Sequence, residues 1–573
     1  MSDPSTDGFG AWLRARGPVE RGTAAFALYL VSSVLIFAGS TILHLGSRCV
    51  GTCRQDSKFY VWALAWMPHA LRHGLDPLWT NALWAPRGVS LAWTASIPGP
   101  ASVTTPITVL FGPLTSLNVL LLAAPAFAGW AAYLMCNQVT RRFWPSFVGG
   151  CVLAFSAYIG QYMRAQINIV SIFLVPLAVY LVLRRVRGTM GPVAFVGLFA
   201  ALLVGQLSIG TETFATMTLF GTVAFVGVCL VGPPDLRDLV RRTGALVALA
   251  YLVAGIVAIP FLVAVLSNVP SHPLRPGDLN SADLLSYLAP PATARFGGAP
   301  FAGVTATFAG IPGEAAYVGV VLIGVIAAFA FEFRHRRSTW LLLAFIAIVV
   351  VLSFGPVLHV GGRPTIWLPG SLLAKVPLLG EALPSRFPLY VWLALSIIVS
   401  IWIAAAAGRG TWLRSLVVVT GIAFVSLNLS AASGAFHGSM PVPAFFADGT
   451  YRRSLTPGEI VLTVPNRTAD DLLWQVDAGL GFRLPRAYVG PANPTGSGGN
   501  LPDRPFAMTN VEVPTKGELV AFLREHAVRS VIVEMPVPDG WNRLLEGTLG
   551  SSPTVVRGVA VWDVPTDLGR VQR

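Results

Sequence analysis

One carboxylate stands out among the residues whose chemistry and position suggest a reaction. Asp56 begins a segment in which Phe59, Trp62 and Trp66 recur at a spacing that predicts a helix. A carboxylate beside a substrate hydroxyl acts as a general base when it removes the hydroxyl proton during transfer of a group to the oxygen. The simpler interpretation is that Asp56 only caps this helix, because Asp is a preferred N-cap residue. The sequence leaves both roles open.

The aromatic residues of this segment predict where its helix lies. A helix with one aromatic face is typical of the headgroup layer of a membrane, so we expect the aromatic face to point into that layer. The segment ends in the turn His73-Gly-Leu-Asp-Pro77. Asp76 has the position of a turn residue before proline, and both His73 and Asp76 are candidate substrate-binding residues.

Four further charged residues are candidates for binding a substrate. Glu212 lies in a short turn between two apolar segments, where it either pairs with Arg164 or binds an acceptor. Arg164, Arg295 and Arg386 have guanidinium groups that match the oxygens of a phosphate. The alternative for each arginine is that it anchors the chain by reaching toward the membrane surface.

Two of the five cysteines predict a local disulfide. Cys49 and Cys53 are four residues apart, and Gly51 between them allows a tight turn. The compartment predicted below for this segment is oxidising, which favours a disulfide. A metal site at the same place would need two further ligands, for which only His69 and His73 are near. We therefore predict no metal site.

The composition is that of a membrane protein. Hydrophobic residues make up 54% of the 573, charged residues make up 12%, and the mean hydropathy is +0.65. The net charge of +13 comes from short arginine clusters between apolar segments, which favours membrane topology over a nucleic-acid partner. Windows of about 20 apolar residues predict eleven transmembrane helices, at 22–45, 116–135, 147–163, 167–183, 191–207, 213–231, 245–266, 317–331, 340–354, 387–407 and 416–432.

The arginines predict the orientation of these helices. Cytoplasmic connections are rich in Lys and Arg, and here basic clusters precede the first helix and then fall in every second connection. We therefore place the N-terminal segment 1–21 in the cytoplasm and the transmembrane domain at 22–432. The connections 46–115, 268–316 and 355–386 and a C-terminal domain, 433–573, are then extracytoplasmic.

The C-terminal domain has the pattern of a small α/β fold. Segments 459–465, 528–534 and 558–564 are typical of strands, and a helix is predicted at 519–526. Thr515 and Glu518 have capping-box spacing before that helix. The domain has no metal-site or Ser/His/Asp spacing, so we expect it to bind a substrate or a partner, or to cap the protein structurally.

Together these residues resemble the GT-C superfamily of polytopic glycosyltransferases. That family takes a sugar from a polyprenyl-phosphate carrier and keeps an acidic residue, here Asp56, in its first outer loop. A largely uncharacterised bacterial branch is more similar still. The matching segments are Asp56, Trp62–Trp66, His73-Gly-Leu-Asp-Pro77, Ala85-Pro-Arg-Gly88, Gln166-Ile-Asn168, Ser208–Ala215, Tyr287–Pro290, Glu314–Gly319 and Leu383–Phe387.

The resemblance implies a transferase of the EC 2.4 class in a bacterial plasma membrane. Its donor would be a polyprenyl-phosphate-linked sugar, and its acceptor a glycan, lipid or protein of the cell envelope. Many family members have two adjacent acids in the first loop, whereas Gln55 precedes Asp56 here. A divalent cation and the stereochemistry are therefore left open. The rival hypotheses are a transporter or flippase of lipid-linked saccharide and a non-catalytic envelope assembly protein.

Overall fold

The computed structural model divides the chain into two compact units. It describes residues 16–268, 280–291, 294, 298–308, 314–373, 375–376, 379–431, 438–465, 469–489, 513–566 and 568. The helical unit comprises residues 1–43, 119–258 and 276–437. The mixed unit comprises residues 44–118, 259–275 and 438–573.

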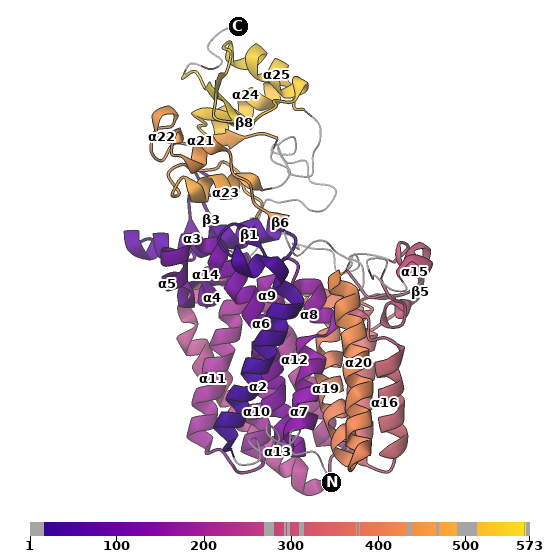
Figure 1. Cartoon of the computed structure of the whole chain (residues 1–573). Helices are drawn as coiled ribbons and strands as arrows, with labels where there is room; N and C mark the ends of the chain where they lie inside the picture. The colour runs from indigo at the N-terminus through magenta and orange to yellow at the C-terminus, as the bar shows by residue number, and fades with distance from the viewer. Residues whose placement is uncertain are drawn as a thin grey trace. The chain divides into compact units, whose positions relative to one another are not determined.

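Long apolar helices form most of the helical unit (Figure 1). Its helices are α2 (Pro18–Ser33), α6 (Pro113–Thr140), α7 (Phe143–Ala154), α8 (Ala157–Tyr162), α9 (Ile167–Val170), α10 (Leu174–Val186), α11 (Pro192–Ile209), α12 (Thr211–Val231), α13 (Pro234–Val257), α15 (Gly298–Thr305), α16 (Val320–Glu332), α17 (Arg337–Ser353), α18 (Gly370–Leu373), α19 (Pro388–Ala405) and α20 (Arg409–Ala431). Short helical turns are η1 (Val34–Ala38), η2 (Gly39–Leu43), η4 (Leu284–Tyr287), η5 (Glu314–Ala316) and η6 (Pro384–Arg386), and one hairpin joins β4 (Val357–Val360) to β5 (Arg363–Trp367).

Eight helical stretches in the described residues are long and apolar enough to cross a membrane, which makes this a multi-pass membrane protein. They are Pro18–Leu43, Pro113–Thr140, Phe143–Tyr162, Ile167–Val186, Pro192–Ile209, Thr211–Val231, Pro234–Val257 and Pro384–Ala405. The three other predicted spans also coincide with helices. Two of these, α16 and α17, are shorter apolar helices of 13 and 17 residues, and the third is α20.

Small residues let neighbouring helices of the bundle approach closely. Gly149 of α7 lies against the backbone of Ser396 in α19, and Gly150 lies against the ring of Tyr29 in α2, so a side chain at either glycine would collide. The Tyr29 hydroxyl donates a hydrogen bond to the carbonyl of Phe147, 2.7 Å away. Close packing of this kind holds helices together where burial of apolar surface from water gives no driving force.

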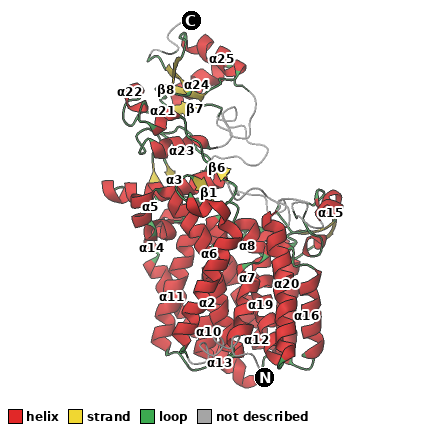
Figure 2. Ribbon diagram, in the orientation of Figure 1, coloured by secondary structure: helices red, strands yellow, loops and turns green. Residues whose placement is uncertain are grey.

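The mixed unit contains most of the strands (Figure 2). Its helices are α3 (Gln55–His73), α4 (Pro98–Val103), α5 (Thr105–Phe111), α14 (Ile259–Leu266), α21 (Ala444–Ala447), α22 (Tyr451–Ser454), α23 (Asp470–Asp477), α24 (Lys516–Glu525) and α25 (Asp539–Leu549), with the turn η3 (Leu91–Trp93). Its strands are β1 (Arg48–Cys49), β2 (Trp79–Thr80), β3 (Val89–Ser90), β6 (Gly438–Ser439), β7 (Val461–Thr463), β8 (Ser530–Glu534), β9 (Thr554–Val556) and β10 (Val559–Asp563).

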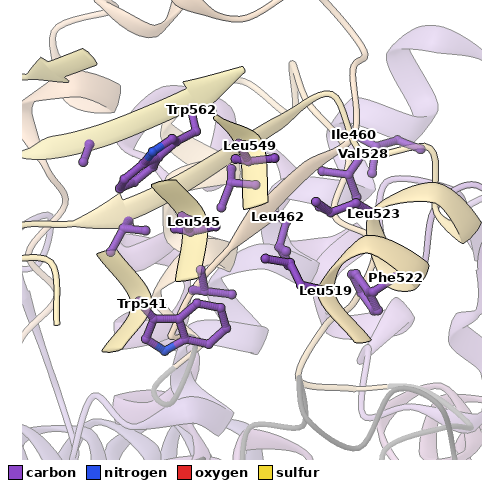
Figure 3. Packing of buried hydrophobic residues seen from close by; sticks show 14 of the residues in the cluster. Ile460, Leu462, Leu519, Phe522, Leu523, Val528, Trp541, Leu545, Leu549 and Trp562 are labelled. Atoms are coloured by element: carbon purple, nitrogen blue, oxygen red, sulfur yellow. The ribbon is translucent and has the colours of Figure 1, made fainter. Parts of the chain in front are cut away.

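A four-stranded sheet organises the C-terminal part of this unit. Its strand order is β7-β8-β10-β9. Strand β7 is parallel to β8, and β10 is antiparallel to both of its neighbours. Helices α24 and α25 pack on the sheet through buried residues that include Leu462, Leu523, Trp541 and Trp562 (Figure 3). The capping box predicted for α24 is present, because the Thr515 side chain accepts from the Glu518 amide and the Glu518 carboxylate accepts from the Thr515 amide.

The mixed unit joins the first long connection to the C-terminal residues, which are predicted from the sequence as separate parts of the chain. The first long connection, 44–118, and the C-terminal residues 438–573 belong to one compact unit. Strand β1 pairs with β6, so Arg48 lies opposite Ser439. The C-terminal residues are therefore packed on the first loop, and the chemistry of Asp56 has to be considered together with them.

Candidate functional site

Asp56 lies in the first turn of α3 but is not its N-cap. The N-cap residue is Arg54, which has an extended backbone and makes no side-chain capping bond. Asp56 is the second residue of the helix, where the partial positive charge of the helix N-terminus stabilises a carboxylate. Asp56 is therefore not the N-cap of α3, and the interpretation that it only caps this helix is wrong.

The carboxylate of Asp56 has a hydrogen-bond partner from the C-terminal residues. The hydroxyl of Tyr488 donates to Oδ1 of Asp56 over 2.7 Å, although the two residues are 432 positions apart. A hydrogen bond to an ionised carboxylate is stronger than one between neutral groups. Tyr488 therefore holds the Asp56 side chain in one orientation.

An ion pair lies two residues further into α3. Lys58 is only 7% exposed, and its ammonium group pairs with the carboxylate of Asp470 at the start of α23. A buried lysine is costly unless it is paired, and Asp470 supplies the opposite charge. Burial raises the pKa of Glu534 at the end of β8, and the charge of Asp470 raises it further against the opposing effect of Lys58.

The aromatic face of α3 is buried in protein, contrary to the prediction that it faces lipid headgroups. Phe59, Trp62 and Trp66 form a ladder of stacked rings whose successive centroids are 6.1 and 5.5 Å apart. All three are buried, and the indole of Trp62 donates to Oε1 of Gln475 in α23 over 2.6 Å. The Gln475 amide in turn donates to the carbonyls of Ala82 and Phe482.

The structure joins Cys49 to Cys53 through a disulfide, with the two Cα atoms 6.0 Å apart. Gly438 lies against the Cys53 sulfur, where a side chain would collide. The Asn118 side chain fixes the same turn, because its amide donates to the carbonyls of Leu45 and Arg48. The disulfide therefore closes the turn that leads into α3, two residues before Gln55.

His73 and Asp76 lie at the other end of α3 from Asp56. A helix rises about 1.5 Å per residue, which puts His73 roughly 25 Å from Asp56 along the axis. His73 is exposed, and its Nδ1 is 2.8 Å from the carbonyl oxygen of His69. The carboxylate of Asp76 accepts from the amide of Leu78, as expected of a turn residue. Neither residue is brought together with Asp56.

A second cluster of candidate residues lies in the helical unit. The guanidinium of Arg386, at the end of η6, forms an ion pair with Glu212 in the first turn of α12. The same carboxylate accepts from the amide of Leu383 over 3.0 Å. Arg386 also contacts Oε1 of Gln166 at 3.5 Å, and its guanidinium lies over the ring of Tyr162. Glu212 thus pairs with Arg386, whereas the sequence suggested Arg164 as its partner.

The side chain of Arg386 is buried in the helical unit. It is 7% exposed, which excludes the alternative that it reaches toward the membrane surface. Its Nε is buried and has no hydrogen-bond partner among the described residues. Arg164 lies half-buried in the turn after α8, whereas Arg295 lies outside the described residues.

Segments that carry the sequence resemblance meet in this cluster. Gln166, Glu212 and Leu383–Arg386 belong to three of these segments. Two more segments meet nearby, because the amide of Val318 donates to the carbonyl of Tyr287 over 3.2 Å. In the described part of the chain, no group of three or more His, Cys, Asp or Glu residues is arranged to hold a metal ion.

Residue type and position in the sequence suggested Asp56, Glu212 and Arg386 as candidates, but not the residues that contact α3. Tyr488, Lys58 and Asp470 carried no motif, and their contacts join segments more than 400 residues apart. The only local signal was the lysine two positions after Asp56, in a chain where almost all other basic residues are arginines.

No family model matches the chain, and no curated protein matches it in sequence. Solved structures do match its fold. The mycobacterial arabinofuranosyltransferase AftD superposes with a TM-score of 0.57 at 13% identity, over 95% of this chain and 40% of AftD. This chain therefore spans about two fifths of the length of AftD.

Two further similar structures were solved with lipid phosphates. ArnT from Cupriavidus metallidurans, bound to undecaprenyl phosphate, has a TM-score of 0.52 at 12% identity and covers 95% of this chain and 99% of its own. The oligosaccharyltransferase AglB from Archaeoglobus fulgidus, in complex with an inhibitory peptide and a dolichol-phosphate, has a TM-score of 0.51 at 11% identity and covers 90% of this chain and 69% of its own. These neighbours are GT-C superfamily glycosyltransferases, and the chain has their fold.

Proposed function

We propose that this protein is a membrane glycosyltransferase that moves a sugar from a polyprenyl-phosphate carrier to a hydroxyl-bearing acceptor of the cell envelope. The observation that carries the proposal is Asp56, an acid in the first turn of the first helix after the first span, on a chain with the GT-C fold. The lipid phosphates bound to ArnT and AglB support a carrier of the same chemical class.

Asp56 is the general base of the proposed reaction. Its carboxylate removes the proton from the acceptor hydroxyl as the hydroxyl oxygen bonds to the anomeric carbon of the sugar. The bond from that carbon to the carrier phosphate breaks, and the electron pair leaves with the phosphate. The hydrogen bond from Tyr488 orients the carboxylate for this step.

Arg386, in the helical unit, is proposed by itself as a residue that binds phosphate. A guanidinium presents its donors in a plane that matches phosphate oxygens. The buried Nε of Arg386 lacks a partner among the described residues, and an anionic oxygen would satisfy it. Glu212 and the Leu383 amide keep the Arg386 region ordered. Arg164 and Arg295 remain further candidates for phosphate binding, whereas His73 and Asp76 are too far along α3 to take part beside Asp56.

The test is the substitution Asp56→Asn in an assay of sugar transfer. The purified protein in lipid is incubated with a panel of polyprenyl-phosphate sugars and envelope acceptors until a pair is found on which the unmodified protein is active. Asn keeps the size of the side chain and its ability to accept from Tyr488, but it is not a base. We expect the rate to fall by about 10²–10⁴-fold.

Asp539→Asn is the matched control, because Asp539 is an exposed acid in the first turn of α25. We expect this variant to transfer sugar at the rate of the unmodified protein. An Asp56→Asn protein that is folded and transfers at the unmodified rate would remove Asp56 from the mechanism. Labelled donor that crosses the bilayer without transfer of its sugar would instead favour the transporter hypothesis.

A further inference from the structure

The hairpin β4–β5 exposes large apolar side chains to its surroundings. Trp367 is 81% exposed and Ile366 is 57% exposed, and every residue of β5 is exposed. Exposed apolar side chains on one short hairpin mark it as a candidate for contact with lipid or with a partner.

The hairpin is held in place from its turn. Asp283 is buried, and its two carboxylate oxygens accept from the amides of Gly361 and Gly362 over 3.1 and 2.8 Å. The hydroxyl of Thr307 donates to the carbonyl of Gly361 over 2.9 Å. Both glycines have positive φ, which the tight turn requires. The hairpin that exposes Trp367 is therefore held in a defined position by these hydrogen bonds.

The base of the hairpin is fixed to the end of an apolar helix. Trp367 lies opposite Val357, and the amide of the next residue, Leu368, donates to the carbonyl of Pro356 over 2.9 Å. Pro356 comes three residues after Ser353, the last residue of α17. Three residues reach at most about 11 Å, and the headgroup layer on each side of a bilayer is roughly 5–8 Å thick. Trp367 is therefore within reach of the headgroup layer.

Other exposed tryptophans identify the opposite membrane surface. Trp144, Trp340 and Trp412 lie in the first turns of α7, α17 and α20. Trp340 and Trp367 thus lie at opposite ends of α17. From Trp340 to Ser353 the helix rises on the order of 20 Å. The three residues from Ser353 to Pro356 add up to about 11 Å, so Trp340 and Trp367 can be separated by about the 30 Å thickness of the hydrocarbon core. Tryptophans are enriched at both surfaces of a membrane.

We propose that the hairpin β4–β5 is a membrane anchor whose Trp367 inserts into the headgroup layer of the lipid surface. The alternative is that a strand of another protein pairs with the exposed edge of β5. Arg363 and Pro364 make this pairing unfavourable, because charges and proline on an edge strand oppose the addition of a strand. The charge of Arg363 instead suits anionic lipid headgroups. The proposal is independent of the enzymatic activity.

The test places an environment-sensitive NBD label at residue 367 through Trp367→Cys in the full chain, reconstituted in vesicles. Nitroxide lipids carry the quencher either near the headgroup or deep in the acyl chain, in both leaflets. Trp144→Cys is the matched membrane standard, because Trp144 is 47% exposed in the first turn of α7, which belongs to one of the eight long apolar stretches. We expect headgroup-proximal nitroxide to quench the label at 367 within about twofold of the label at 144.

The experiment also needs a background control and a second labelled position. Unmodified protein is labelled in parallel to measure the label that its own free cysteines take up, of which Cys136 is buried and Cys151 and Cys229 are half-buried. Thr365→Cys gives a second position on the same face of the strand in case the first variant does not fold. If aqueous iodide quenches the label at 367 and at 365 as strongly as a free NBD thiol adduct, and nitroxide lipid does not, the hairpin is not a membrane anchor.

Discussion

The hydrogen bond between Tyr488 and Asp56 connects the C-terminal residues to the proposed chemistry. Its donor is a neutral phenol and its acceptor is a carboxylate, separated by 2.7 Å. Such a bond contributes about 1.5–3 kcal/mol when one partner is charged. It orients the carboxylate, and it is also the contact through which a displacement of the C-terminal residues would reach the proposed base.

Tyr488→Phe tests this role, since it removes only the hydroxyl. We expect kcat to fall on the order of tenfold with little change in the KM of the acceptor, because the carboxylate loses its fixed orientation but not its charge. Steady-state transfer kinetics provide the measurement. Tyr451→Phe is the matched control, because the Tyr451 hydroxyl donates to a backbone carbonyl, that of Ala478. Equal losses in both variants would indicate a structural effect only.

The ion pair of Glu212 with Arg386 changes what we expect of Glu212. From the sequence, this acid is a candidate for acceptor binding, but in the structure its carboxylate pairs with the guanidinium proposed to bind phosphate. We therefore expect Glu212→Gln to raise the KM of the donor on the order of tenfold and to leave the KM of the acceptor unchanged. Transfer kinetics with each substrate varied in turn provide the measurement.

A double-mutant cycle on the free energy of unfolding tests whether Glu212 and Arg386 interact. Breaking a buried ion pair leaves one charge uncompensated and costs about 3–5 kcal/mol, so Glu212→Gln and Arg386→Met should each destabilise the protein. We expect the double variant to be more stable than the sum of the two effects predicts. Additive destabilisation, or a change in the KM of the acceptor only, would contradict the assigned pairing.

Residue types in the sequence predicted part of this chemistry for a physical reason. An acid or arginine beside apolar spans is costly, so its presence alone indicates a role, as for Asp56, Glu212 and Arg386. Tyr488 and Asp470 give no such signal, because a tyrosine or an acid is ordinary in a polar C-terminal segment. Their contacts with α3 follow from how residues more than 400 positions apart pack together.

At the scale of elements, apolar length predicted the helices well and their surroundings poorly. The predicted spans fall on helical stretches, because a backbone in lipid must pair its own polar groups, but span 245–266 covers both α13 and α14, and α16 has only 13 residues. The aromatic face of α3 has the pattern of a lipid-facing helix, yet Trp62 donates to Gln475 of α23. Buried and lipid-exposed aromatic faces have the same composition, so periodicity does not distinguish them.

The disulfide between Cys49 and Cys53 just before α3 can be tested directly. Cys49 and Cys53 are expected to be cross-linked in protein isolated from its membrane without reductant, as mass spectrometry of unreduced peptides would show. Replacing both with Ser should lower the free energy of unfolding by about 2 kcal/mol, the chain-entropy value for so short a loop. Two free thiols in the folded protein would contradict the disulfide.

At the scale of the whole molecule, the number of crossings decides where the C-terminal residues lie. The eight long apolar helices give an even number of crossings, and α16 and α17 add two more. With only these, both termini would be on one side of the membrane. Helix α20 runs from Arg409 to Ala431 and makes the number odd if it also crosses. The extracytoplasmic location proposed for the mixed unit therefore depends on this one helix.

Reporter fusions test the crossing of α20 directly. Arg336 and Arg337 stand at the start of α17, at an end that the arginine distribution assigns to the cytoplasm. We expect a reporter fused at Arg337 to be cytoplasmic and one fused after Arg573 to be extracytoplasmic. If α20 does not cross, both reporters are on the same side. In that case Asp56 and Tyr488, which touch each other, would be assigned to opposite sides of the membrane, so the fold itself requires the two reporters to differ.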